Sequence, residues 1–303
     1  MTGWLVAGAG GMLGQDMVSA LRARSRSVLG LDSAGLDITD QAAVGALIAS
    51  HRPDVVVNCA AWTAVDAAEA DEQSALAVNG RGPKNLAEAC AATGARLVQV
   101  STDYVFRGDA TQPYETDDTP EPRTAYGRTK LVGERTVLAL LPQAGLVVRT
   151  SWLYGGAGPS FVHTMIRLAG SLPTVDVVTD QRGQPTWTAD VADQIMRFAD
   201  ARVTGICHAT SSGETTWHDL AREVFGLLGA DPERVRPTTG ARSGRLARRP
   251  EYSVLGHRRH AVLGIEPIGD WRAALHRAWP HLASSPGSDD GPKAARVGDR
   301  IRG

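Results

Sequence analysis

The glycine-rich stretch near the start of the chain constrains the fold more than any other feature, and it reads Gly8-Ala9-Gly10-Gly11-Met12-Leu13-Gly14. It follows a short apolar run at 4–8 and precedes a helix-like segment, so it joins a buried strand to a helix. Glycine lets backbone N–H groups at a helix N-terminus approach a phosphate, because a β-carbon would block that approach. We therefore predict cofactor contacts from Gly8, Gly10, Gly11, Met12, Leu13 and Gly14.

Acidic residues near the second predicted strand extend this site. Asp32 ends that strand, and an acid there accepts hydrogen bonds from an adenosine ribose and repels a 2′-phosphate. Asp37 and Ile38 lie just beyond, where an acid and an aliphatic side chain can flank the adenine. A tight turn without a ligand and solvated loop carboxylates are the alternatives. These residues leave the choice between NADH and NADPH open.

Strand-like and helix-like runs alternate through the first half of the chain, which is typical of a parallel sheet covered by helices. The predicted strands lie at 4–8, 28–32, 55–58, 96–101 and 145–150, and the predicted helices at 12–24, 40–48, 73–92 and 124–141. Further helices are predicted at 161–169, 188–201 and 216–228, with a strand at 175–178. The pattern predicts an α/β fold with a Rossmann-type, doubly wound parallel sheet and a smaller C-terminal substrate-binding lobe.

The 303-residue length exceeds that of one ordinary core, which favours two parts. We expect residues 1–150 to form a dinucleotide-binding domain, with parts of 175–205 returning to it. Residues 151–283 would mainly form the substrate-binding lobe. The loss of apolar residues at 284–303 predicts a flexible tail.

Composition narrows the class of protein. The formal net charge of −1 argues against a nucleic-acid partner or a membrane surface. No run approaches the ~18 apolar residues of a membrane span, and no basic segment precedes the first apolar run as in a signal peptide. The cysteines are scattered without metal-type spacing, as in a reducing compartment. We therefore expect a cytoplasmic protein.

A hydroxyl, a tyrosine and a lysine follow the fourth predicted strand. Thr102 lies at the strand's carboxyl end, where ligands of open parallel sheets bind. Tyr126 and Lys130 are four residues apart and share one helical face. An ammonium near the phenol would lower the pKa of Tyr126 below ~10 and prepare it as the acid for a carbonyl oxygen as hydride arrives. An ordinary amphipathic helix is the alternative, and the glycine loop argues against it.

Taken together, these motifs resemble the extended short-chain dehydrogenase/reductases and, more narrowly, the dTDP-4-dehydrorhamnose reductases, over about residues 4–279. The stretches that carry the resemblance are RPDVVVN at 52–58, AAWTAVD at 60–66, STDYVF at 101–106, YGRTK at 126–130, RTSWLY at 149–154, DQRGQPT at 180–186 and RPEYSVL at 249–255.

The resemblance implies roles for individual residues. Thr102, Tyr126 and Lys130 would be the catalytic set, and Asn79 would support the site. The cofactor would contact Tyr126 and Lys130, together with Ala60, Ala61 and Thr63. The substrate would contact Val65, Asp66, Thr102, Asp103, Tyr104, Trp152, Arg248 and Arg249. The two guanidinium forks suit a diphosphate. A solvated basic loop is the alternative for these arginines, and a core aromatic for Trp152.

The resemblance also implies an activity: reduction of the nucleotide sugar dTDP-4-dehydro-L-rhamnose to dTDP-L-rhamnose, the last step of dTDP-rhamnose biosynthesis, with NADPH or NADH. The alternatives are a sugar-nucleotide epimerase or dehydratase and a non-catalytic, cofactor-binding regulatory subunit. Some members of the family dimerise through a magnesium site built from acids. Gln15, Asp16 and Asp190 form a thinner acidic set here, which argues against magnesium, and we expect a monomer or a weak homodimer.

Overall fold

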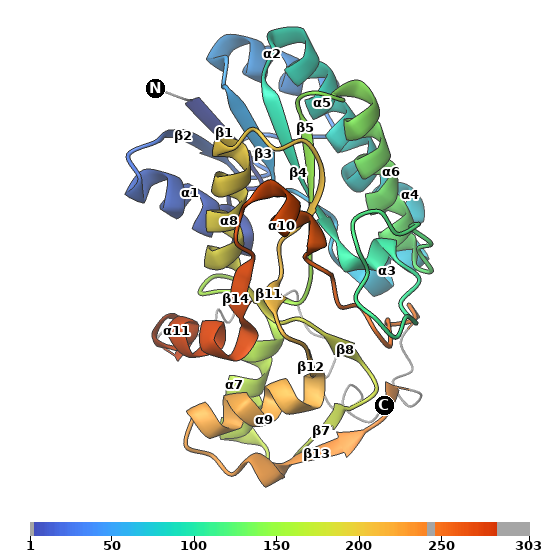
Figure 1. The fold of residues 1–303 in the computed structure, drawn as a ribbon, viewed down its shortest axis with the longest axis vertical. Helices are drawn as coiled ribbons and strands as arrows, with labels where there is room; N and C mark the ends of the chain where they lie inside the picture. Colours follow the sequence, from blue (N-terminus) through green and yellow to red (C-terminus); the bar gives the residue numbers. More distant parts are fainter. Residues whose placement is uncertain (1–2, 241–245, 284–303) are drawn as a thin grey trace.

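The computed structural model describes residues 3–240 and 246–283 (Figure 1). The predicted tail at 284–303 and part of the basic stretch before Arg249 lie outside the described residues. Within the described part of the chain, no helix is long and apolar enough to cross a membrane.

A parallel sheet forms the centre of the larger part of the molecule. Over residues 3–240 and 246–283 it has six strands in the order β10-β5-β4-β3-β1-β2. Their bounds are β1 (Gly3–Ala7), β2 (Ser27–Leu31), β3 (Val55–Asn58), β4 (Arg96–Thr102), β5 (Gly145–Thr150) and β10 (Gly205–His208). The chain moves outward from β1 to β2 and then returns to the other side of β1 at β3. This reversal creates the crevice in which open α/β sheets bind ligands, so the predicted fold class is confirmed.

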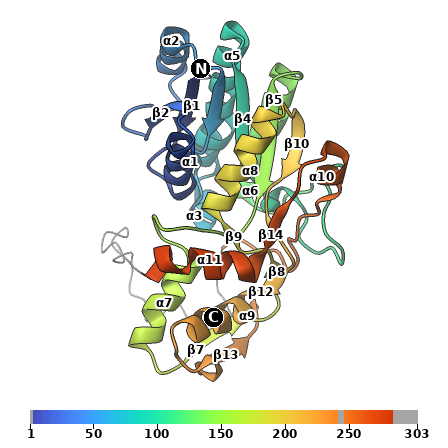
Figure 2. The same cartoon turned by 60° about the vertical axis from the view of Figure 1, so that its left-hand side comes forward.

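Helices cover both faces of this sheet (Figures 1 and 2). On one face, α1 (Met12–Ala23) packs beside α8 (Thr188–Asp200), and on the other lie α2 (Gln41–His51), α5 (Gly82–Thr93) and α6 (Ala125–Leu140). Strand β3 shows why the layers form. Val55 and Val57 enter the core under α1 and α8, whereas Val56 enters the opposite core. Alternate residues of a strand point to opposite faces, so this run of three valines is covered by helices on both sides of the sheet.

The helix predicted at 73–92 is interrupted. It consists of α4 (Glu72–Leu76), a π-helical turn, η1 (Ala77–Arg81), and α5, and the short helix α3 (Val65–Ala70) precedes it. Asn79 lies within this π-helical turn and its side chain is buried. The Asn79 amide accepts from the Trp62 nitrogen at 2.9 Å and donates to the Trp62 oxygen at 3.0 Å. It also donates to Thr129 of α6 at 3.2 Å, which joins the loop after β3 to α6.

A second apolar core lies beyond the carboxyl ends of the strands, in the lower part of Figure 1. It includes Val162, Phe225 and Leu275, from α7 (Phe161–Ser171), α9 (Trp217–Leu227) and α11 (Trp271–Ala283). Strands β7 (Val175–Val178) and β13 (Val235–Thr238) pair in parallel beside them. The remaining short elements are η2 (Asp103–Val105), β6 (Leu153–Tyr154), β8 (Arg182–Gly183), β9 (Thr186–Trp187), β11 (Ser211–Ser212), β12 (Thr215–Thr216), η3 (Pro232–Arg234), α10 (Arg258–Leu263) and β14 (Ile268–Asp270).

Candidate active site

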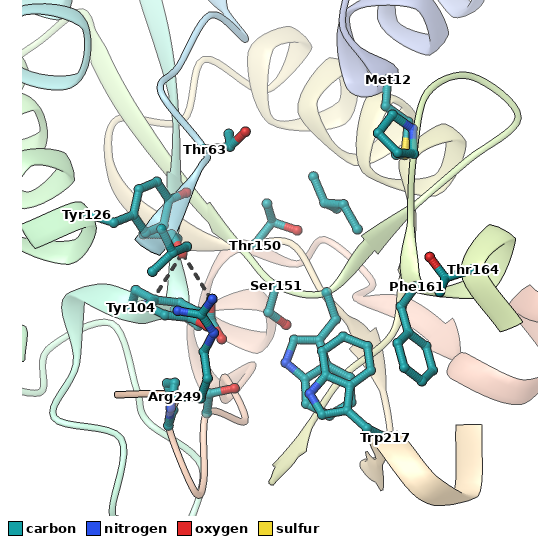
Figure 3. Close-up of a pocket in the computed structure, with 18 of the residues that line it drawn as sticks. Met12, Thr63, Tyr104, Tyr126, Thr150, Ser151, Phe161, Thr164, Trp217 and Arg249 are labelled. Carbon is teal, nitrogen blue, oxygen red and sulfur yellow. Dashed lines mark hydrogen bonds between the residues drawn. The ribbon is translucent and has the colours of Figure 1, made fainter. Parts of the chain in front are cut away.

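A cavity of about 870 Å³ lies between the two cores (Figure 3). Its lining comes from the segments that follow β1, β3, β4 and β5, and from α6, α7, β7 and α9. The predicted site residues in the lining are Gly10, Gly11, Met12, Leu13, Gly14, Ala61, Thr63, Val65, Thr102, Asp103, Tyr104, Tyr126, Lys130, Trp152 and Arg249. The described lining leaves out Gly8, Asp32, Asp37, Ile38, Ala60, Asp66 and Arg248.

The glycine loop presents an uncapped helix N-terminus to this cavity. Gly11 occupies the N-cap of α1 and provides no side-chain hydrogen bond. Gly8 has φ +77°, and a Cβ there would lie 2.5 Å from the Ala60 nitrogen. A Cβ on Gly11 would meet only the Gly8 oxygen, at 3.4 Å. Gly8 is therefore required by the turn itself, whereas the space before Gly11 is left open, which fits a bound pyrophosphate.

The predicted adenosine contacts occupy different environments. Asp32 lies against the loop, since a Cβ on Gly10 would be 3.1 Å from its Cβ, and its Oδ1 accepts from the Gly35 nitrogen at 2.9 Å. Asp37 is exposed and accepts from the Thr39 nitrogen at 2.8 Å. Ile38 is buried in the core, where its side chain fills the space beside Gly82. Of the three, Asp32 is the one that contacts the glycine loop.

Helix α6 brings Tyr126 and Lys130 to the cavity. Thr124 caps the helix, and its Oγ1 accepts from the Gly127 nitrogen at 3.1 Å. Gly127 allows close packing, because a Cβ there would lie 2.2 Å from the Tyr104 oxygen. The Lys130 Nζ donates to the Val100 carbonyl oxygen of β4 at 2.6 Å. The helix is thus fixed against the strand that ends in Thr102.

Burial is the largest influence on the pKa values of Tyr126 and Lys130. Withdrawal of the Tyr126 hydroxyl from water raises the pKa of Tyr126 to about 12, the Asp103 charge adds to the rise, and a hydrogen bond with Thr102 opposes it. Burial lowers the pKa of Lys130 to about 8, against the effect of Glu134. The prediction that the pKa of Tyr126 lies below ~10 was therefore wrong, because burial raises it. The cost of burying the ionised phenolate exceeds what the hydrogen bond with Thr102 returns.

A chain of hydroxyl and carboxyl groups extends from Tyr126. The Thr102 hydroxyl accepts from the Tyr104 nitrogen at 3.2 Å and donates to Asp103 Oδ1 at 3.0 Å. Burial raises the pKa of Asp103 to about 6, while bonds from Ser253 and Thr102 oppose the rise. The rings of Tyr104 and Tyr126 meet edge to face, with centroids 5.6 Å apart.

Of the two predicted arginines, one reaches the cavity. Arg249 donates from Nη2 to Asp66 Oδ2 at 2.6 Å, which fixes its guanidinium at the cavity wall. Its buried Nη1 has no hydrogen-bond partner among the described residues, so this donor is left for a bound anion. Arg248 points elsewhere and pairs with Glu251 at 2.8 Å.

An aromatic wall faces Tyr104 and Tyr126 across the cavity (Figure 3). Trp152 has φ +46°, and its ring stacks on Trp217 with centroids 3.5 Å apart and planes 6° apart. Phe161 contacts Trp217 in turn, at 4.5 Å between centroids. Trp217 and Phe161 were absent from the sequence-based site. Each stands in the first turn of a predicted helix, and only the tertiary fold brings them to the cavity.

The acids considered for magnesium are engaged with other groups. Asp16 accepts from the Thr188 hydroxyl at 2.5 Å, and Asp190 pairs with Arg277 at 2.8 Å. Over residues 3–240 and 246–283, no group of three or more His, Cys, Asp or Glu side chains is arranged to hold a metal ion.

Comparisons with known proteins agree with this geometry. The family model described as the RmlD substrate binding domain matches residues 2–284. A dTDP-4-dehydrorhamnose reductase of Streptomyces griseus is 54% identical over 289 residues, which cover 94% of this chain and 95% of that protein. A dTDP-4-keto-6-deoxy-D-glucose reductase of Streptomyces niveus is 50% identical over 279 residues, covering 92% and 97%.

A solved structure gives the same assignment. The dTDP-4-dehydrorhamnose reductase of Bacillus anthracis, in complex with NADP, matches with a TM-score of 0.89 at 34% identity, over 92% of this chain and 99% of that one. The resemblance predicted from the motifs is confirmed. The chain belongs to the RmlD substrate-binding family, within which its similar curated relatives include dTDP-4-dehydrorhamnose reductases.

Proposed function

We propose that this protein reduces the 4-keto group of dTDP-4-dehydro-L-rhamnose to give dTDP-L-rhamnose, with NADPH as the hydride donor and NADH as an accepted substitute. The observation that carries the proposal is that Tyr126, hydrogen-bonded to Thr102, lines the same cavity as the uncapped helix N-terminus at Gly11. The names of the similar reductases and the NADP complex of the B. anthracis protein support the substrate and the cofactor.

The residues then have distinct tasks. When bound, the cofactor supplies the hydride that reduces the carbonyl carbon. The Tyr126 hydroxyl, neutral because its pKa is about 12, donates the proton to the carbonyl oxygen, and Thr102 orients that hydroxyl. Protonated Lys130 stabilises the tyrosinate that remains. The free Nη1 of Arg249 binds an oxygen of the substrate diphosphate.

The assay that tests the proposal uses dTDP-4-dehydro-L-rhamnose with NADPH and then NADH. Loss of the reduced-nicotinamide absorbance should match product formation mole for mole. An epimerase or dehydratase that recycles its cofactor would form product without this loss, and a regulatory subunit would form none. With dTDP-4-keto-6-deoxy-D-glucose, the substrate in the name of the S. niveus relative, we expect a lower kcat/KM.

Location and assembly remain predictions. We propose a cytoplasmic enzyme that acts as a monomer or a weak homodimer, with residues 1–150 mainly holding the cofactor and 151–283 mainly holding the substrate. The free cysteines Cys59, Cys90 and Cys207 support a reducing compartment. Sedimentation at several concentrations measures the oligomeric state.

A further inference from the structure

A buried ion pair joins α6, the helix of Tyr126 and Lys130, to strand β5. Tyr126, Lys130 and Glu134 are spaced four residues apart and share one face of α6, and the exposed fractions of Lys130 and Glu134 are 4% and 1%. Arg149 of β5, also 1% exposed, donates to Glu134 through two bonds, Nε to Oε1 at 2.9 Å and Nη2 to Oε2 at 2.7 Å.

The position of Arg149 in the sheet connects this pair to the site. Arg149 is in register with Ser101 of β4, the residue before Thr102, and with His208 of β10. Its guanidinium carbon lies 4.8 Å from the centre of the Phe106 ring. The Glu134 fork, the Phe106 ring and the pairing of β5 with both neighbouring strands therefore fix the arginine, and the fork in turn fixes one turn of α6.

We propose that the Glu134–Arg149 pair is a positioning device for the proposed reduction: it holds α6 in the register that places the Lys130 ammonium on the Val100 carbonyl, and its carboxylate keeps that ammonium charged beside Tyr126. The inference rests on the proposed function for its activity readout. Neither residue is in the described lining of the cavity.

Charge explains why such a pair is needed. Burial lowers the pKa of Lys130 to about 8, and the Glu134 carboxylate is the leading influence in the opposite direction. Near pH 7 the other charged groups around this cluster are Arg149 and Asp103, whose pKa is raised to about 6 and whose charge acts on Tyr126. The neighbouring thiol, phenol and imidazole are neutral. The pKa of the Cys59 thiol is raised to about 12, that of Tyr126 to about 12, and that of His208 is lowered to about 3. Without the carboxylate, Lys130 would lose its proton at lower pH.

The test replaces both charges at once, because removing one would leave the other buried and unpaired. The variant is Glu134→Leu/Arg149→Met, whose apolar side chains have similar volume. The matched control is Glu72→Leu/Arg128→Met. Arg128 stands on the same helix and makes an equally forked bond to Glu72, at 2.9 and 2.6 Å, but on the solvent side.

We expect the alkaline limb of the kcat/KM profile to move down by about one pH unit in the buried-pair variant, with about a fivefold loss of kcat at pH 8. KM should change little, and the control should keep the parent profile. The pH dependence of NADPH affinity, followed by nicotinamide fluorescence, should shift in the same direction even if turnover is too slow to measure. In a Lys130→Met background the pair substitution should have no further effect on either profile.

A second variant keeps the test decisive if the first fails to fold. Arg149→Lys retains both charges but replaces the fork with a single donor, so more of the carboxylate charge is felt at Lys130. The alkaline limb should then move to higher pH rather than to lower pH. The proposal is overturned if a folded buried-pair variant keeps the parent pH profiles, if its effect is as large without Lys130, or if Arg149→Lys leaves the limb in place. A protein that reduces no nucleotide sugar but still shows the predicted shift in NADPH affinity would contradict the proposed function alone.

Discussion

The Nζ atom of Lys130 lies 2.6 Å from the carbonyl oxygen of Val100, two residues before Thr102. This bond ties the helix that carries Tyr126 to the strand that carries Thr102. It also directs the ammonium toward the Val100 carbonyl dipole. Burial at this position lowers the pKa of Lys130 to about 8. The lysine, rather than the tyrosine, therefore titrates close to neutral pH.

The alkaline limb of the activity profile should report Lys130. Its pKa of about 8 means that the charged form is lost as the pH rises through 8, well before Tyr126 at about 12 loses its proton. We expect kcat/KM to fall above about pH 8. Residual activity of Lys130→Arg, whose guanidinium stays charged, should lack this limb. Lys84→Met, at an exposed ion pair with Glu88, should retain it. A limb that is unchanged in Lys130→Arg would contradict the assignment.

Asp103 should make stability depend on pH in a direction opposite to that of most carboxylates. Burial raises its pKa from 3.8 to about 6, so the folded protein binds a proton more readily than the unfolded chain. Stability from this group is therefore gained as the pH falls from about 6 to about 4, by at most about 3 kcal/mol.

Urea denaturation of the parent and Asp103→Asn at pH 7, 5.5 and 4.5 measures this effect. The asparagine variant should be more stable relative to the parent at pH 7 than at pH 4.5, since other carboxyl groups titrate alike in both. A difference between the two proteins that stays constant with pH would show that Asp103 does not have a raised pKa.

Gly11 should matter for the cofactor and little for the fold. A Cβ there meets only the Gly8 oxygen at 3.4 Å, yet it would enter the space before the N-terminus of α1. We expect Gly11→Val to weaken NADPH binding at least about tenfold, or about 1.4 kcal/mol. Gly45→Val, in α2 with nothing within 4 Å of the added Cβ, is the matched control. If fluorescence titration gave Gly11→Val the NADPH affinity of the parent, the loop would not be part of the binding site.

The strands at 4–8, 28–32, 55–58, 96–101 and 145–150 and the helix of Tyr126 could be predicted because short sequence features determine them. Glycines at a strand-to-helix turn, the valine run at 55–57 and the Thr124 cap each determine structure within a few residues. Strand β10 (Gly205–His208) was not predicted, since a short segment of mixed polarity becomes a strand only beside β5. The π-turn at Asn79 was also missed, because the helical periodicity continues through it.

Properties that depend on tertiary packing could not be predicted from the sequence. The pKa of Tyr126 rises because several segments together exclude water, and spacing to Lys130 says nothing about that burial. Trp217 reaches the cavity by stacking on Trp152, a residue far away in the chain. Ile38 was placed beside the adenine on its position after Asp37, but it packs against Gly82 in the core.

The most direct test of the account is the turnover of Tyr126→Phe with dTDP-4-dehydro-L-rhamnose and NADPH, measured on protein shown to be folded and to bind NADPH as the parent does. The substitution removes the hydroxyl that donates the proton and leaves the ring against Tyr104. We predict that kcat falls by about 10²–10⁴-fold. Near-parental turnover would contradict the account, because the proton would then come from another group, with Tyr104 the first candidate.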